Sequence, residues 1–450
     1  MSAASPLTKY QCVSILVVSF LGWMFAGVQM GINGIVHHPA ARDLLGASAE
    51  KAEVAKWSGW LVVAFLLGAA AGGYLFGWVG DRFGRSRAMS LSIGCYAIFS
   101  AVSAYSPSVE VFWVLRFLTC IGIGGMWPNG MALLQEAWPN TAKPILAGVL
   151  GTSANVGIMC FALLCMQVDV TPNHWQWAML VGGSPICLAV AAWFLVPESP
   201  KWLAQEHHQS ATGKQVGMSE VFSPPHLRLT IIGIVLAFVP LFGGWGVANW
   251  ANYWSAEFDE QVTAKQGIGD DGSTTQAAAS GKKIQISAAQ ASFHRSWPGA
   301  ISSLLGGALA FLLGRRFSYA LLCLLAFTCT QFLYSVPDPS ADGFLFWVRG
   351  LGFFSGFFFG WLPLCLPEMF PTRVRSTGSG VSFNFGRIVV ALLIIVTSLA
   401  LKSYFEGSYD QVGLVCGYVY LLGVVTVFLL PATSKDSQLG EEVLSVGVDG

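Results

Sequence analysis

Charged residues are scarce in this chain of 450 residues. They make up 11% of it, against about 25% in an ordinary soluble domain, while 54% of the residues are hydrophobic. So little charge excludes a soluble globular domain, because the apolar surface could not all be buried in one core. Runs of about 20 apolar residues recur, each long enough to cross a bilayer core of about 30 Å. The sequence therefore predicts an all-α integral membrane protein with about twelve transmembrane helices.

The predicted spans rest on hydropathy, so their ends are defined to a few residues. They lie near 11–36, 57–78, 88–106, 110–134, 145–167, 176–196, 229–253, 297–315, 317–336, 343–366, 378–402 and 411–431. No small-residue cleavage site follows the first apolar run. We therefore expect a retained first helix rather than a signal peptide.

Patterns that carry enzyme chemistry are equally scarce. Lys plus Arg and Asp plus Glu both number 24, and this zero net charge argues against a nucleic acid partner. All ten cysteines fall inside apolar runs, which indicates free thiols and offers no metal-ligand spacing. No paired carboxylates, Cys/His arrangement or phosphate-cradling loop stands outside the motifs described below. No enzyme activity, metal or cofactor is predicted.

Basic residues lie in alternate short connections between the predicted spans, as Arg82, Arg85, Arg315, Arg316 and Arg375 do. Opposite short connections, such as SVPDPSADG, have no Lys or Arg, whereas the long segment 255–296 contains Lys265, Lys282, Lys283 and Arg295 and carries less weight in the positive-inside rule. The positive-inside rule then places the basic connections and both termini in the cytoplasm. We expect a monomeric multi-pass protein of the inner (plasma) membrane, whose partners are membrane lipids, a small-molecule solute and, if transport is coupled, protons.

The two halves of the chain echo one another. The matching pairs are Gly84 with Gly314, Arg116 with Arg349, and Glu136 with Glu368, at offsets of 230 (314 − 84), 233 (349 − 116) and 232 (368 − 136). A nearly constant offset predicts two six-helix repeats. The expected organisation is an N-terminal six-helix bundle at 1–196, a cytoplasmic linker at 197–228, a C-terminal six-helix bundle at 229–431 with a polar extracytoplasmic insertion at 255–296, and a cytoplasmic tail at 432–450.

The stretch GWVGDRFGRSR packs four charged residues between two uncharged runs. Asp81 stands where a carboxylate can accept hydrogen bonds from the exposed amides that begin the next helix. Charges recur at the ends of spans four, six and ten, which predicts ion pairs that hold the two halves together at the cytoplasmic rim. Ordinary interfacial anchoring is the alternative. The predicted latch consists of Asp81, Arg82, Arg85, Glu136, Glu198, Arg315, Arg316, Glu368 and Arg375.

These residues also carry a family resemblance. GWVGDRFGRSR resembles the loop 2–3 signature of the major facilitator superfamily, RFLTCIGIGG its helix-four pattern, and PESPKWL the end-of-helix-six signature of its sugar-porter and organic-ion branches. LPEMFPTRVRSTGSGVSFNFGRI resembles the loop 10–11 and helix-eleven region of metabolite:proton and sialate:proton symporters. The resemblance covers nearly the whole chain apart from 255–296. It implies a transporter built from two rocking six-helix bundles.

Two departures from the family pattern stand out. Many relatives carry acidic residues in helix one, in a pattern like GW-x-F-D-G-x-D, whereas this chain reads GWMFAGVQMGI with Ala26 and Gln29 at those places. The resemblance therefore does not extend to proton coupling through that helix. Phe311 replaces Asp81 in the second-half copy of the loop signature. The fifth span, GVLGTSANVGIMC, also lacks the Gly-Pro motif of drug:proton antiporters, which disfavours drug export.

Polar side chains inside a span are costly in lipid, so they should face a cavity or a partner. Arg387 lies about two and a half turns into the eleventh span, where snorkelling is difficult, and a fixed cation there favours an anionic substrate. Arg116 could instead snorkel, and each amide suits a helix–helix hydrogen bond as well as a ligand. The predicted substrate-binding residues are Gln29, Asn33, Arg116, Trp127, Asn129, Asn155, Asn249, Asn252, Tyr253, Trp361, Asn384 and Arg387.

The sequence predicts a secondary transporter or facilitator for a small organic solute, favouring an organic acid or sugar acid. A neutral sugar or polyol facilitator is the alternative within transport, with Arg387 bracing the helix backbone. A non-transporting receptor is the alternative outside transport. The short linker and tail disfavour it, because a receptor that signals through a partner would need a long cytoplasmic domain. His37 and His38 are expected to be a solvated pair at the extracytoplasmic mouth of the first span.

Overall fold

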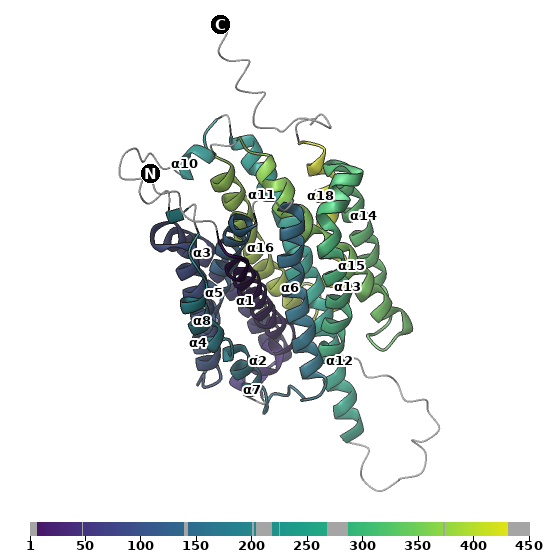
Figure 1. The fold of residues 1–450 in the computed structure, drawn as a ribbon. Helices are drawn as coiled ribbons and strands as arrows, with labels where there is room; N and C mark the ends of the chain where they lie inside the picture. Colours follow the sequence, from purple (N-terminus) through teal and green to yellow (C-terminus); the bar gives the residue numbers. More distant parts are fainter. Residues whose placement is uncertain are drawn as a thin grey trace, which may run out of the picture.

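The computed structural model describes residues 7–46, 48–138, 143–199, 202–203, 218–224, 226–267, 287–371 and 374–430. Parts of the predicted linker, insertion and tail lie outside these ranges. Across the described residues the chain is almost entirely helical, and an isolated bridge between Thr171 and His174 is the only β-type pairing in them. Figure 1 shows long helices running side by side.

The N-terminal half contains α1 (Lys9–Ile35), α2 (His37–Leu45), α3 (Lys51–Phe83), α4 (Arg85–Ser103), α5 (Val109–Ala137), α6 (Lys143–Cys165), α7 (Gln176–Gly183) and α8 (Ile186–Leu195). The C-terminal half contains α11 (Leu227–Phe242), η1 (Gly243–Val247), α12 (Ala248–Gly267), α13 (Ala288–Leu313), α14 (Arg315–Tyr334), α15 (Asp342–Glu368), α16 (Arg375–Ser403), α17 (Tyr409–Gly417) and α18 (Val419–Val427). The short α10 (Met218–Val221) lies between them.

Within the described residues, eleven helical stretches are long and apolar enough to cross a membrane. Three of these stretches join consecutive helices, namely α7 with α8, α11 through η1 with α12, and α17 with α18. Helix α4, of 19 residues, packs against α3, α5 and α8 and makes a twelfth rod. The predicted all-α membrane fold with about twelve transmembrane helices is confirmed.

Two of the three breaks inside the rods coincide with a proline. Pro185 stands at the start of α8, where a residue without an N–H cannot continue the hydrogen-bond ladder of α7. Pro240 lies in the last turn of α11, directly before the π-helical turn η1, GGWGV. A π turn widens the helix by one residue and is often found at functional sites.

Two predicted boundaries of the insertion at 255–296 are wrong. Helix α12 continues to Gly267 instead of ending near 253, and α13 begins at Ala288 instead of near 297. The earlier start has a sequence signal that hydropathy overlooks. Ser287 and Gln290 form a capping box, in which each side chain bonds the other residue's backbone N–H. Arg295 therefore lies inside a membrane-spanning helix.

Close packing of helices defines each half. Cβ atoms at Gly72 and Gly124 would overlap the backbone of the partner helix across the α3–α5 contact. Gly352 and Gly360 play the same part across the α13–α15 contact. Small residues of this kind let helix backbones approach closely where no hydrophobic force drives association. Equivalent helices in the two halves are thus packed in the same way.

The two ends of the bundle differ in their side chains. We call the end that carries Arg85 and Arg315 the basic end, and the opposite end, which carries His37 and His38, the histidine end. In Figure 1 α10 and α18 lie at the basic end, at the top, while α2, α7 and the extension of α12 lie at the bottom.

Candidate functional site

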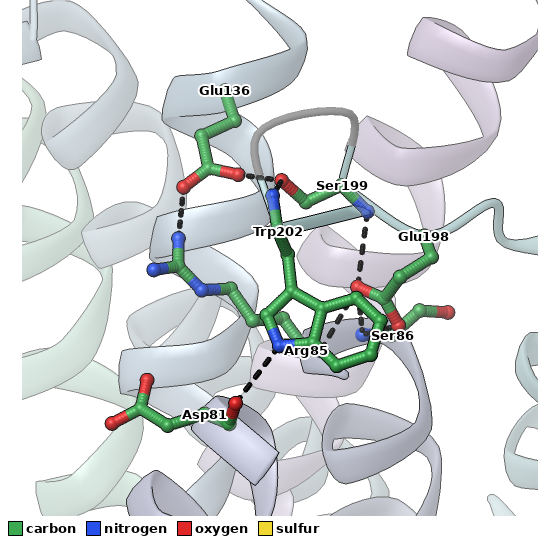
Figure 2. Close-up of polar contacts among 7 residues, drawn as sticks. All are labelled: Asp81, Arg85, Ser86, Glu136, Glu198, Ser199 and Trp202. Carbon is green, nitrogen blue, oxygen red and sulfur yellow. Dashed lines mark hydrogen bonds and ion pairs between the residues drawn. The ribbon is translucent and has the colours of Figure 1, made fainter. Parts of the chain in front are cut away.

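The predicted cluster at the basic end forms around the joint between α3 and α4 (Figure 2). Arg85 pairs with Glu136 at the end of α5, and the hydroxyl of Ser199 donates to the same carboxylate. Glu198 accepts hydrogen bonds from the backbone N–H groups of Arg85, at 2.9 Å, and of Ser86, at 3.1 Å. The first amides of α4 are therefore capped by a carboxylate from the residues that follow α8.

The prediction that Asp81 caps α4 is wrong, because Glu198 accepts the hydrogen bonds of those amides. Asp81 contributes its backbone oxygen, which accepts from Trp202 Nε1 at 2.9 Å, and its exposed carboxylate points away from the cluster (Figure 2). Gly84 is required at the joint for two reasons. Its φ is +103°, a conformation that favours glycine, and a Cβ would overlap the Glu198 carboxylate.

The second half repeats the joint, with no equivalent cap among the described residues. Gly314 has φ +80° and Arg315 pairs with Glu368 at 2.6 Å, as Arg85 pairs with Glu136. A Cβ at Gly314 would meet nothing within 4 Å, so the backbone conformation alone calls for glycine there. Arg316 and Arg375 donate to the carbonyls of Leu430 and Phe370.

The ion pairs that the structure describes at the basic end each join helices of the same half. Arg85–Glu136 links α4 to α5, and Arg315–Glu368 links α14 to α15. Arg82 stacks over the ring of Trp78, 5.5 Å from its centroid, which fits interfacial anchoring. A latch between the halves remains a prediction, since in this conformation the pairs brace each half separately.

At the histidine end, contacts between polar side chains do cross between the halves. Lys51 at the start of α3 pairs with Glu257 of α12 at 3.1 Å. His38 Nδ1 lies 3.6 Å from Glu260 Oε1, also on α12. The Tyr253 hydroxyl donates to the carbonyl of Asn33 at 3.4 Å. The first two helices and α3 are thereby fastened to α12.

Helices α3 and α16 pack against each other near the histidine end and no longer do so near the basic end. Gly59 lies against Ser398, and Gly73 lies against Asn384. One turn further along α3, a Cβ at Gly77 would meet nothing within 4 Å, and the same holds for Gly380 near the start of α16. The two halves are therefore joined from the histidine end to about mid-depth along this contact.

Three predicted site residues form one buried network at the histidine end of α1 and α5. Arg116 donates to Gln29 Oε1 at 2.8 Å and to Asn33 Oδ1 at 3.0 Å, and all three side chains are fully buried. Gln29 in turn donates to the carbonyl of Gly182 at 2.8 Å. Arg116 does not snorkel, and its charge is shared among neutral oxygens inside the N-terminal half.

Arg387 lies at the contact between the halves, near the middle of α16. Its Nη1 donates to the carbonyl of Ala69 on α3 at 3.2 Å and to Asn384 Oδ1 at 3.2 Å. Its guanidinium also lies 4.7 Å from the ring centroid of Phe383. The side chain is 8% exposed, and among the described residues no carboxylate lies within ion-pair distance of it.

Comparison with known proteins agrees with this architecture. A family model described as Major Facilitator Superfamily matches residues 12–394, most of the chain. The chain belongs to the major facilitator superfamily. A putative metabolite transport protein of Haemophilus influenzae is 27% identical over 92% of this chain and 95% of its own length. A cis,cis-muconate transport protein of Acinetobacter baylyi is 28% identical over 83% of this chain and 85% of its own.

A solved structure shows the same superfamily fold. The xylose transporter XylE of E. coli, in an inward open conformation, superposes with a TM-score of 0.69 at 16% identity, covering 96% of this chain and 99% of that one. Membership in the superfamily together with these relatives shows that the chain is a solute transporter, a multi-pass membrane protein and not an enzyme.

The remaining predicted site residues of this superfamily member are spread over several contacts. Asn155 donates to Ser303 at 3.0 Å across the halves, whereas Asn129 donates to the carbonyls of Phe76 and Gly125. The ring of Trp127 lies 5.1 Å from that of Trp23. Asn249 donates to the Trp245 carbonyl, and Asn252 lies against Gly34. Trp361 donates to the Arg315 carbonyl. Trp361, fully buried within the C-terminal half, is poorly placed to contact a solute between the halves.

The prediction that His37 and His38 are solvated is wrong. They are 0% and 7% exposed, and both ring nitrogens of His37 are buried without a hydrogen-bond partner. Burial, with Arg116 nearby, lowers the pKa of His37 well below its usual value. Burial and Arg42 lower the pKa of His38 to about 4. The short α2, which turns back into the protein, buries these rings, and an amphipathic segment following the first span was the available signal.

Proposed function

We propose that this transporter carries a small organic acid by alternating access of its two halves. Arg387 carries the proposal. It is a nearly buried cation at the contact between the halves, and its hydrogen bonds go only to neutral oxygens. An uncompensated charge at membrane depth is costly, and an anionic solute would neutralise it. The name of the cis,cis-muconate transport protein, a relative that carries an organic acid, supports this class.

We further propose that the basic end faces the cytoplasm, as the positive-inside rule asks, and that the protein acts as a monomer in the inner membrane. In that orientation the structure is closed on the extracytoplasmic side. The contacts Lys51–Glu257 and His38–Glu260 cross the halves there, whereas the ion pairs formed by the described residues of the basic end stay within one half. The conformation is then the inward-facing member of the cycle.

Residues of α1 do not supply a proton carrier in this cycle. Gln29 occupies the position beside Arg116 and does not titrate in water. Any coupled proton must be carried elsewhere, and His38 beside Glu260 is a titratable pair that links the halves.

A neutral sugar or polyol facilitator is the second candidate. Its support is that Arg387 already donates to the Ala69 carbonyl and to Asn384, which are the bonds a purely bracing residue would make. The two candidates differ in whether removal of the positive charge affects the binding of acids alone.

The test uses Arg387→Gln in the full chain reconstituted into liposomes. Loss of one charge-assisted contact should weaken uptake of organic acids about ten- to hundredfold. Arg228→Gln is the matched control, because Arg228 is exposed and donates to the carbonyl of Leu429 far from α16. Unchanged uptake of acids by Arg387→Gln, with sugars stabilising the wild-type protein in a thermal-shift screen, would favour the neutral facilitator instead.

A further inference from the structure

A cavity of about 200 Å³ lies at the histidine end of the C-terminal half, between α12 and the start of α17. One wall belongs to α12, where Trp254, Glu257, Phe258 and Gln261 are spaced i, i+3, i+4 and i+7 and so share one helix face. The other wall is the segment 406–410, which leads into α17. A water molecule occupies about 30 Å³ in the liquid, so the cavity has room for a small organic molecule.

The walls of this cavity carry three carboxylates and no Lys, Arg or His. Glu257 Oε1 accepts from Lys51 of the N-terminal half and from Gln261, both at 3.1 Å, and Oε2 has no hydrogen-bond partner among the described residues. The side chains of Glu406 and Asp410 form no ion pair or hydrogen bond with any described residue. One lysine therefore offsets three carboxylates, and the excess negative charge attracts a cation.

A buried hydroxyl points to a ligand independently of these charges. Tyr409 is 5% exposed and lines the cavity, and its hydroxyl forms no hydrogen bond with a described residue. A hydroxyl on so buried a side chain is expected to have a partner, and the cavity is the space from which one can come. The ring itself is held in place by Trp250, with 5.9 Å between the ring centroids.

The aromatic side chains indicate which kind of cation fits. Trp254, Phe258 and Tyr409 all line the cavity. The Trp254 ring is fixed by Tyr334 and Phe344, whose centroids lie 6.1 Å and 5.8 Å away. Ammonium groups bind over the faces of such rings. Among the described residues no group of three His, Cys, Asp or Glu is arranged to hold a metal ion. The walls therefore suit an organic ammonium better than a metal ion.

We propose that this cavity binds a small organic cation through an ammonium group. The ammonium lies between the carboxylates of Glu257 and Asp410, and the apolar part of the molecule lies against the ring of Trp254. Because Glu257 also pairs with Lys51, the bound cation and Lys51 compete for this carboxylate. The ammonium can belong to a free amine or to the headgroup of phosphatidylethanolamine. The site does not depend on which solute the protein carries.

The test compares tert-butylammonium with tert-butanol, which has nearly the same shape without the charge. Binding is measured by saturation-transfer NMR on the full chain in an uncharged maltoside detergent. The wild-type protein should bind the ammonium at least about fivefold more tightly than the alcohol. Asp410→Asn should weaken binding of the ammonium about two- to fivefold. Glu110→Gln is the matched control and should leave it unchanged, since Glu110 is an exposed carboxylate at the same end of the other half.

Lys51→Met provides the decisive comparison, because a misfolded variant would not bind more tightly. Removal of the lysine leaves Glu257 without its counter-charge, so affinity for tert-butylammonium should rise about two- to fivefold. Unchanged or lower affinity in Lys51→Met would overturn the proposal. Equal binding of tert-butanol would also overturn it, as would displacement of the ammonium by an equal concentration of K⁺ or Ca²⁺, which would indicate a non-selective acidic surface.

A short-chain lipid separates the two sources of the ammonium. Dihexanoyl phosphatidylethanolamine should displace tert-butylammonium from the wild-type protein if the cavity takes a lipid headgroup. If the lipid does not displace it, the ligand is a free amine. Both results support an ammonium site, whereas a wild-type protein that binds neither compound would contradict it.

Discussion

At the scale of single residues, the carboxylate that caps α4 at the basic end is Glu198 and not the expected Asp81. Both Asp81 and Glu198 were expected in the cluster, but only Glu198 reaches the free amides of α4. Glu198 sits three residues after α8, and Ser199 beside it bonds Glu136. The residues that leave the last helix of the N-terminal half are thereby tied to the α3–α4 joint. The PESP sequence has a structural task that does not require contact with the solute.

Glu198→Ala should destabilise the protein by about 1–2 kcal/mol, because two amides at the start of α4 lose their acceptor. Asp81→Ala should stay within about 0.5 kcal/mol, as an exposed side chain away from such features does. Thermal unfolding in detergent compares the two variants. Equal losses, or a larger loss for Asp81→Ala, would contradict the assignment of the cap.

At the scale of helices, small residues decide how closely α3 and α5 approach. Gly72 lies directly against the backbone of Ile121, while Gly77, five residues further along α3, faces nothing within 4 Å. Both are helical glycines with ordinary backbone angles, so they differ only in their surroundings. One glycine serves packing, and the other lies where the halves have separated.

Gly72→Ala should destabilise the protein by about 1–3 kcal/mol, since an added methyl must push α3 away from α5. Gly77→Ala should be neutral or stabilising by up to about 1 kcal/mol, because alanine is the better helix former. Chemical or thermal unfolding of the two single variants measures the difference. If the two halves come together around Gly77 when the histidine end opens during transport, Gly77→Ala should slow transport without loss of stability.

At the scale of the whole molecule, the histidine end brings His38 of the N-terminal half against Glu260 of the C-terminal half. The charged and titratable groups that face His38 are Arg42 on its own helix and Glu260 and Tyr253 on α12. Although Glu260 would favour a protonated ring, burial dominates and keeps the pKa of His38 at about 4. His38 is therefore neutral at pH 7 in this conformation.

Acidification should shift the protein toward separation of the halves at the histidine end. Once the halves separate at this end, water reaches His38 and returns its pKa toward 6.5. The open form therefore binds the proton more readily than the closed form. Between pH 6.5 and about 4 the open population should rise by up to about tenfold per pH unit. Spin-label distances across this end, at pH 8 and pH 5, measure the shift.

His38→Gln should abolish the pH response, and Glu260→Gln should retain it. A response that persists in His38→Gln would assign the titration to another group and contradict the role of this ring.

Hydropathy and charge spacing predicted the membrane fold, and the internal repeat led to the equivalent ion pairs Arg85–Glu136 and Arg315–Glu368. This prediction was possible because a membrane-spanning segment must be a long apolar helix whose backbone groups bond one another. Each span meets this requirement in its own sequence. Helix ends were less predictable. The true start of α13 depended on a capping box at Ser287, which an average over hydropathy does not detect.

The candidate site was predicted only in part. The sequence placed Gln29, Asn33 and Arg116 on their helices, but it could not tell that they bond one another instead of lining a space. Whether a polar side chain inside a membrane is free or satisfied depends on which helices pack against it. The sequence by itself determined which segments cross the membrane, since that property is local; only the tertiary structure decided which charges lack a partner, since a partner comes from another helix.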